Sequence, residues 1–181
     1  PPKVVEELVP NLLPLGGVVQ VLQNLLREQV PIRDLLTILE TLADWSPAIK
    51  DLDILTEHVR HGLSRTITKM HLTPEGHIAA ITLGHSPEST ISGALQQTDH
   101  GSFLSLDPSV AQKMMNNLTA SLEKMSSLNY QPVVMCSSQI RYHVKRLIDR
   151  FMPHMVVLSY DEILSNVEIQ SLDMLELSHA D

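Results

Sequence analysis

The histidines are the residues of this sequence that first suggest a metal site. The chain has nine, and His58 and His61 lie three residues apart on one predicted helix. A zinc site needs three or four convergent ligands, and neither a cysteine pair nor a His-Glu-x-x-His motif accompanies these two. Three others, His77, His85 and His100, lie near the ends of predicted strands, where only chance would bring them together. We therefore predict no metal site.

The single cysteine, Cys136, ends an apolar run, Val133–Cys136, directly before a predicted helix. Open α/β sheets place active sites at this edge, and a helix N-terminus would lower the pKa of a thiol. One interpretation is therefore a small α/β enzyme that uses Cys136 as nucleophile beside a histidine such as His154. The other is a small buried side chain that closes a strand. We favour the second, because cysteine outside disulfides is among the most buried residue types.

Other enzyme motifs are incomplete. Ser137 and Ser138 lack the Gly-x-Ser-x-Gly elbow of a nucleophilic serine and fit a helix cap better. Gly16 and Gly17 precede a helix without the further glycines or the lysine of a nucleotide-binding loop. The sequence thus predicts no catalytic residue, no cofactor and a protein that is not an enzyme.

Composition narrows the class of partner. The formal net charge is -8 and aromatic residues make up 3%. Nucleic-acid binding needs clustered Lys and Arg or aromatic stacking platforms, so we predict no nucleic-acid partner. No stretch approaches the ~20 consecutive apolar residues of a membrane span, so the chain as given is predicted to be soluble.

Partner proteins are the remaining class, and a few residues are candidates to contact them. The only basic cluster is predicted on the outer side of one helix, where complementary charge would steer an acidic partner, although such a run is more often a solvated face. Two further candidates are the pair Arg33 and Asp34, at the exposed start of a helix, and Trp45, whose indole is expected not to be wholly buried. These candidate contact residues are Arg33, Asp34, Trp45, Arg141, Lys145, Arg146 and Arg150.

The elements that carry these residues begin with the tract 17–45, which has helical apolar spacing in both halves. Pro31 should end the first helix and occupy the first turn of the second, so we expect the two helices side by side as a hairpin. A third long helix, capped by Asp51 or Asp53, should cover the hairpin. Its predicted buried residues are Leu52, Leu55, Val59, Leu63, Ile67 and Met70. Residues 1–70 thus form a predicted all-α domain.

After a linker at 71–76 the pattern changes to short apolar runs between capped helices. Strands are predicted at 77–83, 103–106, 133–136, 155–158 and 167–172, and helices after Ser86, after Asp107, around 140–151 and at 160–164. Leu95 and Phe151 are assigned to the buried sides of the first and third of these helices. Strands that alternate with helices favour a largely parallel sheet covered by helices. Residues 77–175 thus form a predicted small α/β domain.

Several stretches resemble a known family. They are VEELVPNLL (5–13), VLQNLLREQVPIRDLLTILETLADW (21–45), LTEHVRHGLSR (55–65), FLSLDP (103–108), PVVMCSSQIRYHVKRLIDRFMP (132–153) and VLSYDEILSNVEIQSL (157–172). Together they resemble the C-terminal cytoplasmic part of the FlhA/InvA family, the export-gate proteins of type III secretion. The VEELVP opening and the NVEIQS ending favour the flagellar branch over the injectisome branch.

The resemblance implies a fragment of a bacterial inner-membrane protein whose missing N-terminal part spans the bilayer. The beginning of the chain, which looks like a helix cut partway, agrees with that expectation. The cytoplasmic part of such a protein forms a homo-oligomeric ring. Its implied partners are export substrates with their chaperones, soluble components of the export ATPase complex and other gate subunits. The alternatives are an injectisome homologue, the Cys136 enzyme and a stand-alone signalling module.

Overall fold

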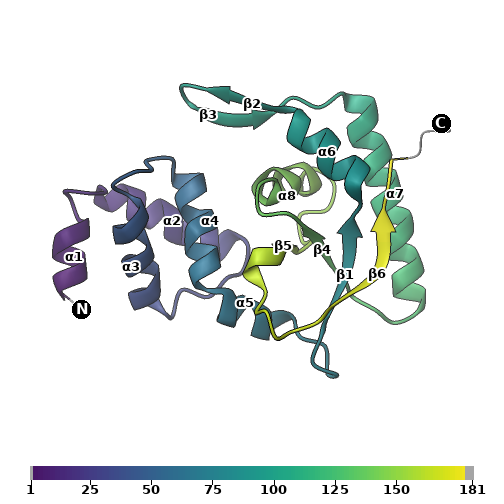
Figure 1. The fold of residues 1–181 in the computed structure, drawn as a ribbon, viewed down its shortest axis with the longest axis horizontal. Helices are drawn as coiled ribbons and strands as arrows, with labels where there is room; N and C mark the ends of the chain where they lie inside the picture. Colours follow the sequence, from purple (N-terminus) through teal and green to yellow (C-terminus); the bar gives the residue numbers. More distant parts are fainter. Residues whose placement is uncertain (1, 178–181) are drawn as a thin grey trace. The chain divides into compact units, whose positions relative to one another are not determined.

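The computed structural model describes residues 2–177, and the chain divides into two compact units, Pro1–Met70 and His71–Asp181 (Figure 1). The first unit is built from helices, and the second combines helices with a four-stranded sheet and a two-stranded sheet. The predicted fold class, an all-α part followed by an α/β part with a parallel sheet, is confirmed.

The helical unit consists of α1 (Pro2–Leu8), α2 (Leu15–Arg27), α3 (Leu35–Trp45), α4 (Leu52–Gly62) and α5 (Ser64–His71). Helix α4 packs against both α2 and α3, and α3 also packs against α1. The core is aliphatic, as the scarcity of aromatic residues requires, and its fully buried members include Leu8, Val21, Leu25, Ile38, Leu42 and Leu55.

The segment between α2 and α3 differs from the prediction of a short turn. Helix α2 ends at Arg27 because Gln29 takes a left-handed conformation (φ 61°), after which the Val30 amide donates to the Leu25 carbonyl at 2.9 Å. Pro31 therefore lies in an extended segment and not in the first turn of α3. The expected hairpin is wrong, because residues 28–34 are long enough to redirect the chain and α4 serves as the common partner.

The predicted third helix is two helices. Asp51, one of the two predicted caps, is the N-cap of α4: its side chain accepts hydrogen bonds from the amides of Asp53 and Ile54. The helix ends at Gly62, and Leu63 bridges to α5. Leu55, Val59, Leu63 and Ile67 are buried as predicted, whereas Met70 is exposed and its prediction is wrong.

The α/β unit is built on a parallel sheet with the strand order β5-β4-β1-β6. Its strands are β1 (Ile78–Leu83), β4 (Val133–Cys136), β5 (Val157–Ser159) and β6 (Ile169–Leu175). The connecting helices are α6 (His85–Gly93), α7 (Pro108–Ser127), α8 (Arg141–Asp149) and the 3-10 helix η1 (Tyr160–Glu162). Every residue of β4 is buried, as expected for a strand covered on both faces.

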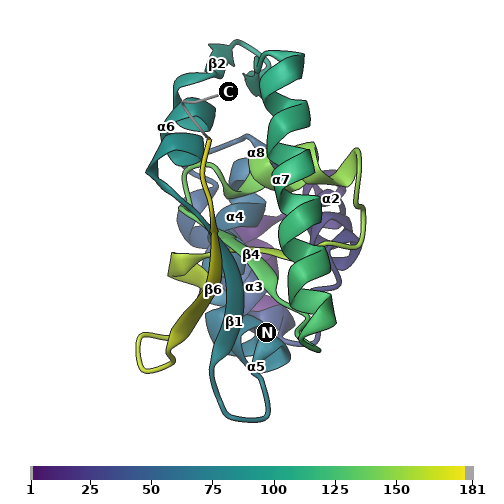
Figure 2. The ribbon, with the colours of Figure 1, turned by 90° about the vertical axis from the view of Figure 1, so that its right-hand side faces the viewer.

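The core of this unit lies between the sheet and two helices. Ile81, Val134 and Val157 are in register across three strands and belong to one buried cluster with residues of α7 and α8. Figure 2 shows α7 running beside the sheet. Helix α7 begins where predicted, because the Asp107 side chain accepts a bond from the Ser109 amide and Pro108 occupies the first turn.

The predicted strand at 103–106 overlaps an observed strand at residues 103–104, but the β-hairpin that contains it was missed by the sequence analysis. Strands β2 (Leu95–Thr98) and β3 (Gly101–Leu104) pair antiparallel and form a separate two-stranded sheet. Leu95 therefore begins a strand and does not belong to the buried side of α6, whose cap is Gly84 and not Ser86. Phe151, expected to be buried, is exposed after the end of α8.

Candidate protein-interaction surfaces

The predicted basic face of α8 is not a single surface. Arg141 is fully buried: its exposed fraction is 0%, its guanidinium lies 3.7 Å from the Glu162 carboxylate, and it donates to the Val157 carbonyl at 2.8 Å. Glu162 also accepts a bond from the Ser159 amide at 3.0 Å. The prediction that Arg141 lies on the outer side of this helix is therefore wrong, because this arginine joins α8 to β5 and η1 inside the unit.

Lys145 also turns inward. It is 7% exposed and donates to the carbonyls of Pro153 and Met155, at 3.2 and 2.8 Å, while its amine lies 2.7 Å from the Asp149 carboxylate. The prediction that Lys145 lies on the outer side of α8 is wrong as well. Helical spacing alone did not reveal this, because α8 buries most of its circumference and leaves few positions for solvent.

Arg146 and Arg150 are exposed, and both line one hollow in the α/β unit, which we call the α8 groove. Its volume is about 560 Å³. The groove lies between the β2–β3 hairpin, the start of α7 and helix α8. The lining residues are Ser102, Phe103, Leu104, Leu106, Pro108, Ala111, Gln112, Tyr142, His143, Arg146, Leu147, Arg150 and Phe151.

Two contacts hold the walls of the α8 groove in place. The Ser102 hydroxyl and His143 Nε2 are hydrogen-bonded at 3.2 Å, which ties the hairpin to α8. Arg146 donates to the Tyr142 hydroxyl at 2.9 Å, and its guanidinium carbon lies 5.7 Å from the centre of the Tyr142 ring. The guanidinium is therefore oriented before any partner binds.

Arg33 and Asp34 are exposed at the start of α3, as predicted. Asp34 is the N-cap: it accepts the Thr37 amide at 3.2 Å and the Thr37 hydroxyl at 2.7 Å. The hydroxyl bond, followed by the amide bond, lowers the pKa of Asp34 below its usual value. Its local role is thus to begin the helix.

Trp45, also exposed in part, stacks on a histidine of α4. The indole and the His58 ring are 3.8 Å apart between centroids and nearly parallel, with an interplanar angle of 13°. The His61 ring meets His58 edge-on at 6.2 Å. The two histidines singled out as possible metal ligands therefore belong to a ring stack. Within residues 2–177, no group of three or more His, Cys, Asp or Glu side chains could hold a metal ion.

Helix α2 has an apolar face that the sequence analysis missed. Leu15 and Leu26 are 65% and 51% exposed, Val19 is exposed, and Leu22 between them is half-buried. Their spacing of four, three and four residues places them on one side of the helix, next to the stripe that packs into the core. The excess of apolar residues in α2 was visible in the sequence, but it does not tell which stripe faces inward.

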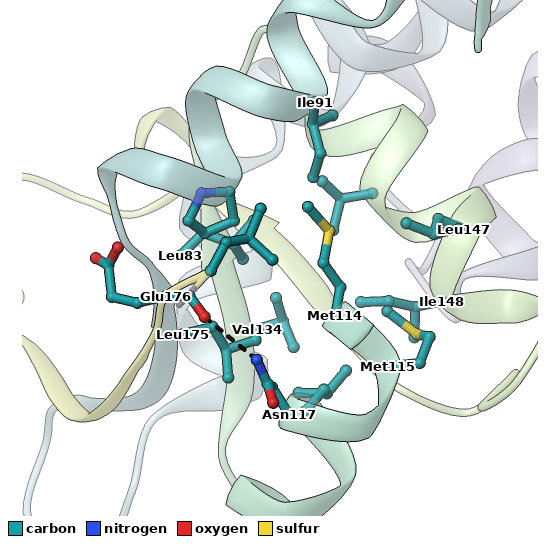
Figure 3. Close-up of a pocket in the computed structure, with 14 residues that line it drawn as sticks. Leu83, Ile91, Met114, Met115, Asn117, Val134, Leu147, Ile148, Leu175 and Glu176 are labelled. Atoms are coloured by element: carbon teal, nitrogen blue, oxygen red, sulfur yellow. Dashed lines mark hydrogen bonds between the residues drawn. The ribbon is translucent and has the colours of Figure 1, made fainter. Parts of the chain in front are cut away.

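A second pocket of the α/β unit is a packing gap in its core (Figure 3). Side chains of Leu83, Met114 and Leu147 face the same apolar space, and Asn117 closes one side by donating to the Glu176 carbonyl at 3.2 Å. The volume of about 20 Å³ has room for roughly one water molecule. This pocket is too small to be a substrate site.

The carboxyl edge of the sheet holds Cys136 in a structural setting. The thiol is fully buried, and the Glu88 carboxylate accepts both the amide and the hydroxyl of Ser137 at 2.8 Å. Parallel pairing places Cys136, the last residue of β4, beside Ser159, the last residue of β5. The exposed His154 instead precedes the amino end of β5. The sheet therefore keeps the proposed nucleophile and base at opposite edges.

Comparison with known proteins groups this fold with the cytoplasmic regions of type III secretion export-gate proteins. More particularly, the family model described as FHIPEP matches residues 1–168, and the chain belongs to that family. It is 37% identical over 176 residues to the flagellar biosynthesis protein FlhA of Bacillus subtilis. The aligned residues cover 97% of this chain and 26% of the relative. The chain thus spans about a quarter of the length of that relative.

The solved structures that match this chain cover residues of both units. The Chlamydia pneumoniae CdsV and CdsO protein complex matches with a TM-score of 0.85 and 32% identity, covering 97% of this chain and 51% of the other. The nonameric EscV cytosolic domain from the type III secretion system matches with a TM-score of 0.76 and 32% identity, covering 95% and 50%. None of the described helices has both the length and the apolar content needed to cross a bilayer.

Proposed function

We propose that this chain is part of the cytoplasmic region of a bacterial flagellar export gate, that it assembles into a homo-oligomeric ring, and that it docks components of the export apparatus. Its partners are export substrates with their chaperones, soluble components of the export ATPase complex and other gate subunits. The longer protein would attach it to the inner membrane. The observation that carries the proposal is the match of both units to a nonameric cytosolic domain.

The apolar face of α2 is the surface best suited to subunit contact. Leu15, Val19 and Leu26 are exposed together on one helix side of an otherwise acidic chain. Burying a side chain of this size against a neighbouring subunit contributes about 1.5–3 kcal/mol. A stripe of three such residues therefore supports a subunit interface.

The ring is tested with variants of this face in the longer protein. Replacing Val19 and Leu26 with Glu puts two charges where a neighbour would bury apolar surface. We expect the subunit contact to weaken by at least about 100-fold, from roughly 3 kcal/mol of lost burial. Light scattering coupled to gel filtration, with electron microscopy of the particles, measures the loss of rings.

The matched control is Gln23→Glu, which adds a charge at an exposed polar position of the same helix. It should leave the rings intact. If the double variant also forms rings of unchanged stability, the α2 face is not the interface. If the parent protein does not form rings at all, the assembly proposal itself fails.

The flagellar assignment has an injectisome alternative. The match to a flagellar biosynthesis protein over 97% of this chain favours the flagellar branch. Deleting the gene and restoring it in the source organism distinguishes the two, because a flagellar gate is required for motility and an injectisome gate for secretion into host cells.

We also propose that the chain has no catalytic activity. The burial of Cys136 and its separation from His154 by the length of a strand support this.

A further inference from the structure

The α8 groove has an unusual share of the aromatic residues of the chain. The sequence contains two phenylalanines, Phe103 and Phe151, and both line this groove while remaining 50% and 44% exposed. A folded protein usually places Phe in its core, because burying the ring is favourable by about 1.5–3 kcal/mol. Here the core is aliphatic and both rings stand at the surface. The groove therefore presents apolar area that a partner could cover.

The charge of the α8 groove is opposite to that of the chain. Arg146 and Arg150 are exposed and line it, and among the described residues that line it there is neither Asp nor Glu. The whole chain carries a net charge of -8. A local positive site in an acidic molecule selects an anionic group and orients it, and arginine does so with a planar fork that fits a carboxylate.

The residue types in the groove are those that dominate binding energy in protein interfaces. Tyr and Arg are enriched at hot spots, and Phe is enriched at interface centres. Tyr142 holds the Arg146 guanidinium through a hydrogen bond of 2.9 Å, so less side-chain freedom is lost when a partner binds. The volume of about 560 Å³ holds several side chains of a partner.

We propose that the α8 groove binds a segment of a partner export protein in which one carboxylate lies between large apolar side chains. The carboxylate meets Arg146 and Arg150, and the apolar side chains cover Phe103 and Phe151. The proposal rests on the proposed function in one respect, that the partner belongs to the export apparatus. A second copy of this acidic chain, a lipid surface and a nucleic acid are the other possible occupants, and the experiment detects each of them.

The experiment places a photocrosslinking benzoylphenylalanine at Phe103 or at Phe151 in the full-length protein in living cells. The control position is Tyr130, which is exposed on the same unit and outside the groove. Crosslinked products are identified and the attachment point is mapped by mass spectrometry. We expect attachment from both groove positions, and not from Tyr130, to one segment that contains Asp or Glu beside large apolar residues.

Charge reversal then tests the chemistry of recognition. Arg150→Glu should reduce the crosslink at least about tenfold, because it replaces attraction with repulsion at the rim. Lys124→Glu, the same change at an exposed position of α7 outside the groove, should not. Replacing the mapped acidic residue of the partner with Arg should restore the crosslink to the Arg150→Glu protein.

Each other outcome overturns the inference. These outcomes are no adduct, an adduct with a second copy, lipid or nucleic acid, or a protein adduct that Arg150→Glu leaves unchanged. Ring assembly and motility are also measured on the parent protein. If the parent forms rings and supports motility while neither groove position gives an adduct, the groove proposal fails and the proposed function stands, whereas failure of the parent protein in both assays removes the proposed function itself.

Discussion

Arg141 has the chemistry of a surface residue and the position of a core residue. It is the largest fully buried side chain of the described chain, and its partners are the Glu162 carboxylate and the Val157 carbonyl. A buried charge is tolerated only when it is paired and hydrogen-bonded, so each member of the pair requires the other. The pair is thus a structural link between α8 and η1.

We expect Arg141→Met to destabilise the protein by about 3–5 kcal/mol, because it leaves Glu162 as an uncompensated buried charge. Denaturant unfolding followed by circular dichroism measures the change. Replacing both residues, as Arg141→Met with Glu162→Leu, should cost less than the single change. Arg150→Met, at an exposed position, should stay within about 0.5 kcal/mol of the parent. A single variant as stable as the parent would show that the pair contributes nothing.

His58 links the Trp45 stack to pH. Burial, and after it the neighbouring His61, lowers the pKa of His58 below its ordinary value of 6.5, while Glu57 opposes the shift. Between the lowered pKa and 6.5 the unfolded chain binds more protons at this residue than the folded chain does. The contribution of His58 to stability is therefore complete above pH 6.5, is lost as the pH falls through 6.5, and levels off below the folded pKa.

We expect acidification from about pH 7.5 to about pH 5.5 to destabilise the parent more than His58→Tyr, which keeps a ring against Trp45 but does not titrate in this range. Urea unfolding at the two pH values measures the difference. A proton NMR titration of the His58 ring reads the pKa directly. Equal losses in the two proteins, or a His58 pKa at or above 6.5, would contradict the assignment.

At the scale of the elements, the end of α2 depends on a residue in an unfavourable conformation. Gln29 has φ 61°, a region that costs a side-chain-bearing residue roughly 1–2 kcal/mol and costs glycine nothing. The conformation is imposed because the Val30 amide must reach the Leu25 carbonyl to close the helix. The Glu28 carboxylate, 3.5 Å from the buried Arg60 guanidinium, holds the same segment to α4.

We expect Gln29→Gly to stabilise the chain by about 0.5–1 kcal/mol. Glycine relieves the backbone strain, but part of this gain is offset because glycine has greater conformational freedom in the unfolded state. Thermal unfolding measures it as a rise in Tm. Asn129→Gly is the matched comparison, because Asn129 has φ 66° but asparagine tolerates this region better, so its gain should be smaller. A lower Tm for Gln29→Gly would mean that its side chain makes a contribution that the backbone argument omits.

The elements were predictable where periodicity and capping agreed. Helix α7, with Asp107 and Pro108 at its start, and strand β4, a continuous apolar run, were both found. The β2–β3 hairpin was not, because Gln96, Gln97 and their neighbours lack the alternating apolar pattern of a half-buried strand. The left-handed conformation of Gln29 could not be predicted either, because the residue expected in that conformation is glycine.

The candidate surfaces were less predictable than the fold. Arg146 and Arg150 were correctly expected to be exposed, but the same pattern included Arg141 and Lys145. The burial of Arg141 depends on β5 and η1, and that of Lys145 on the carbonyls of Pro153 and Met155 in the loop after α8, which helical spacing does not reveal. The groove itself could not be predicted, because its walls come from a hairpin and two helices that only the tertiary structure brings together. The family resemblance, by contrast, was visible in the sequence and is confirmed.

At the scale of the whole molecule, Cys136 reports on the integrity of the α/β unit. Its thiol is fully buried in the cluster formed by the sheet, α7 and α8, so reagents reach it only when that unit opens. We expect thiol labelling at neutral pH to be slow in the folded protein and to accelerate with denaturant in step with loss of structure. Rapid labelling of the native protein would instead favour a reactive cysteine and the enzyme interpretation.

The order of the strands has a consequence for how the chain is made. The central strand β1 pairs with β6, which comes about ninety residues later, and the hydroxyls of Thr82 and Ser171 bond at 2.7 Å across that interval. While a ribosome is still extending the chain, one edge of β1 has no partner and can join another nascent copy. We therefore expect the second half of this protein to need shielding during translation, by a holding chaperone or by rapid release, until residues 169–175 have emerged.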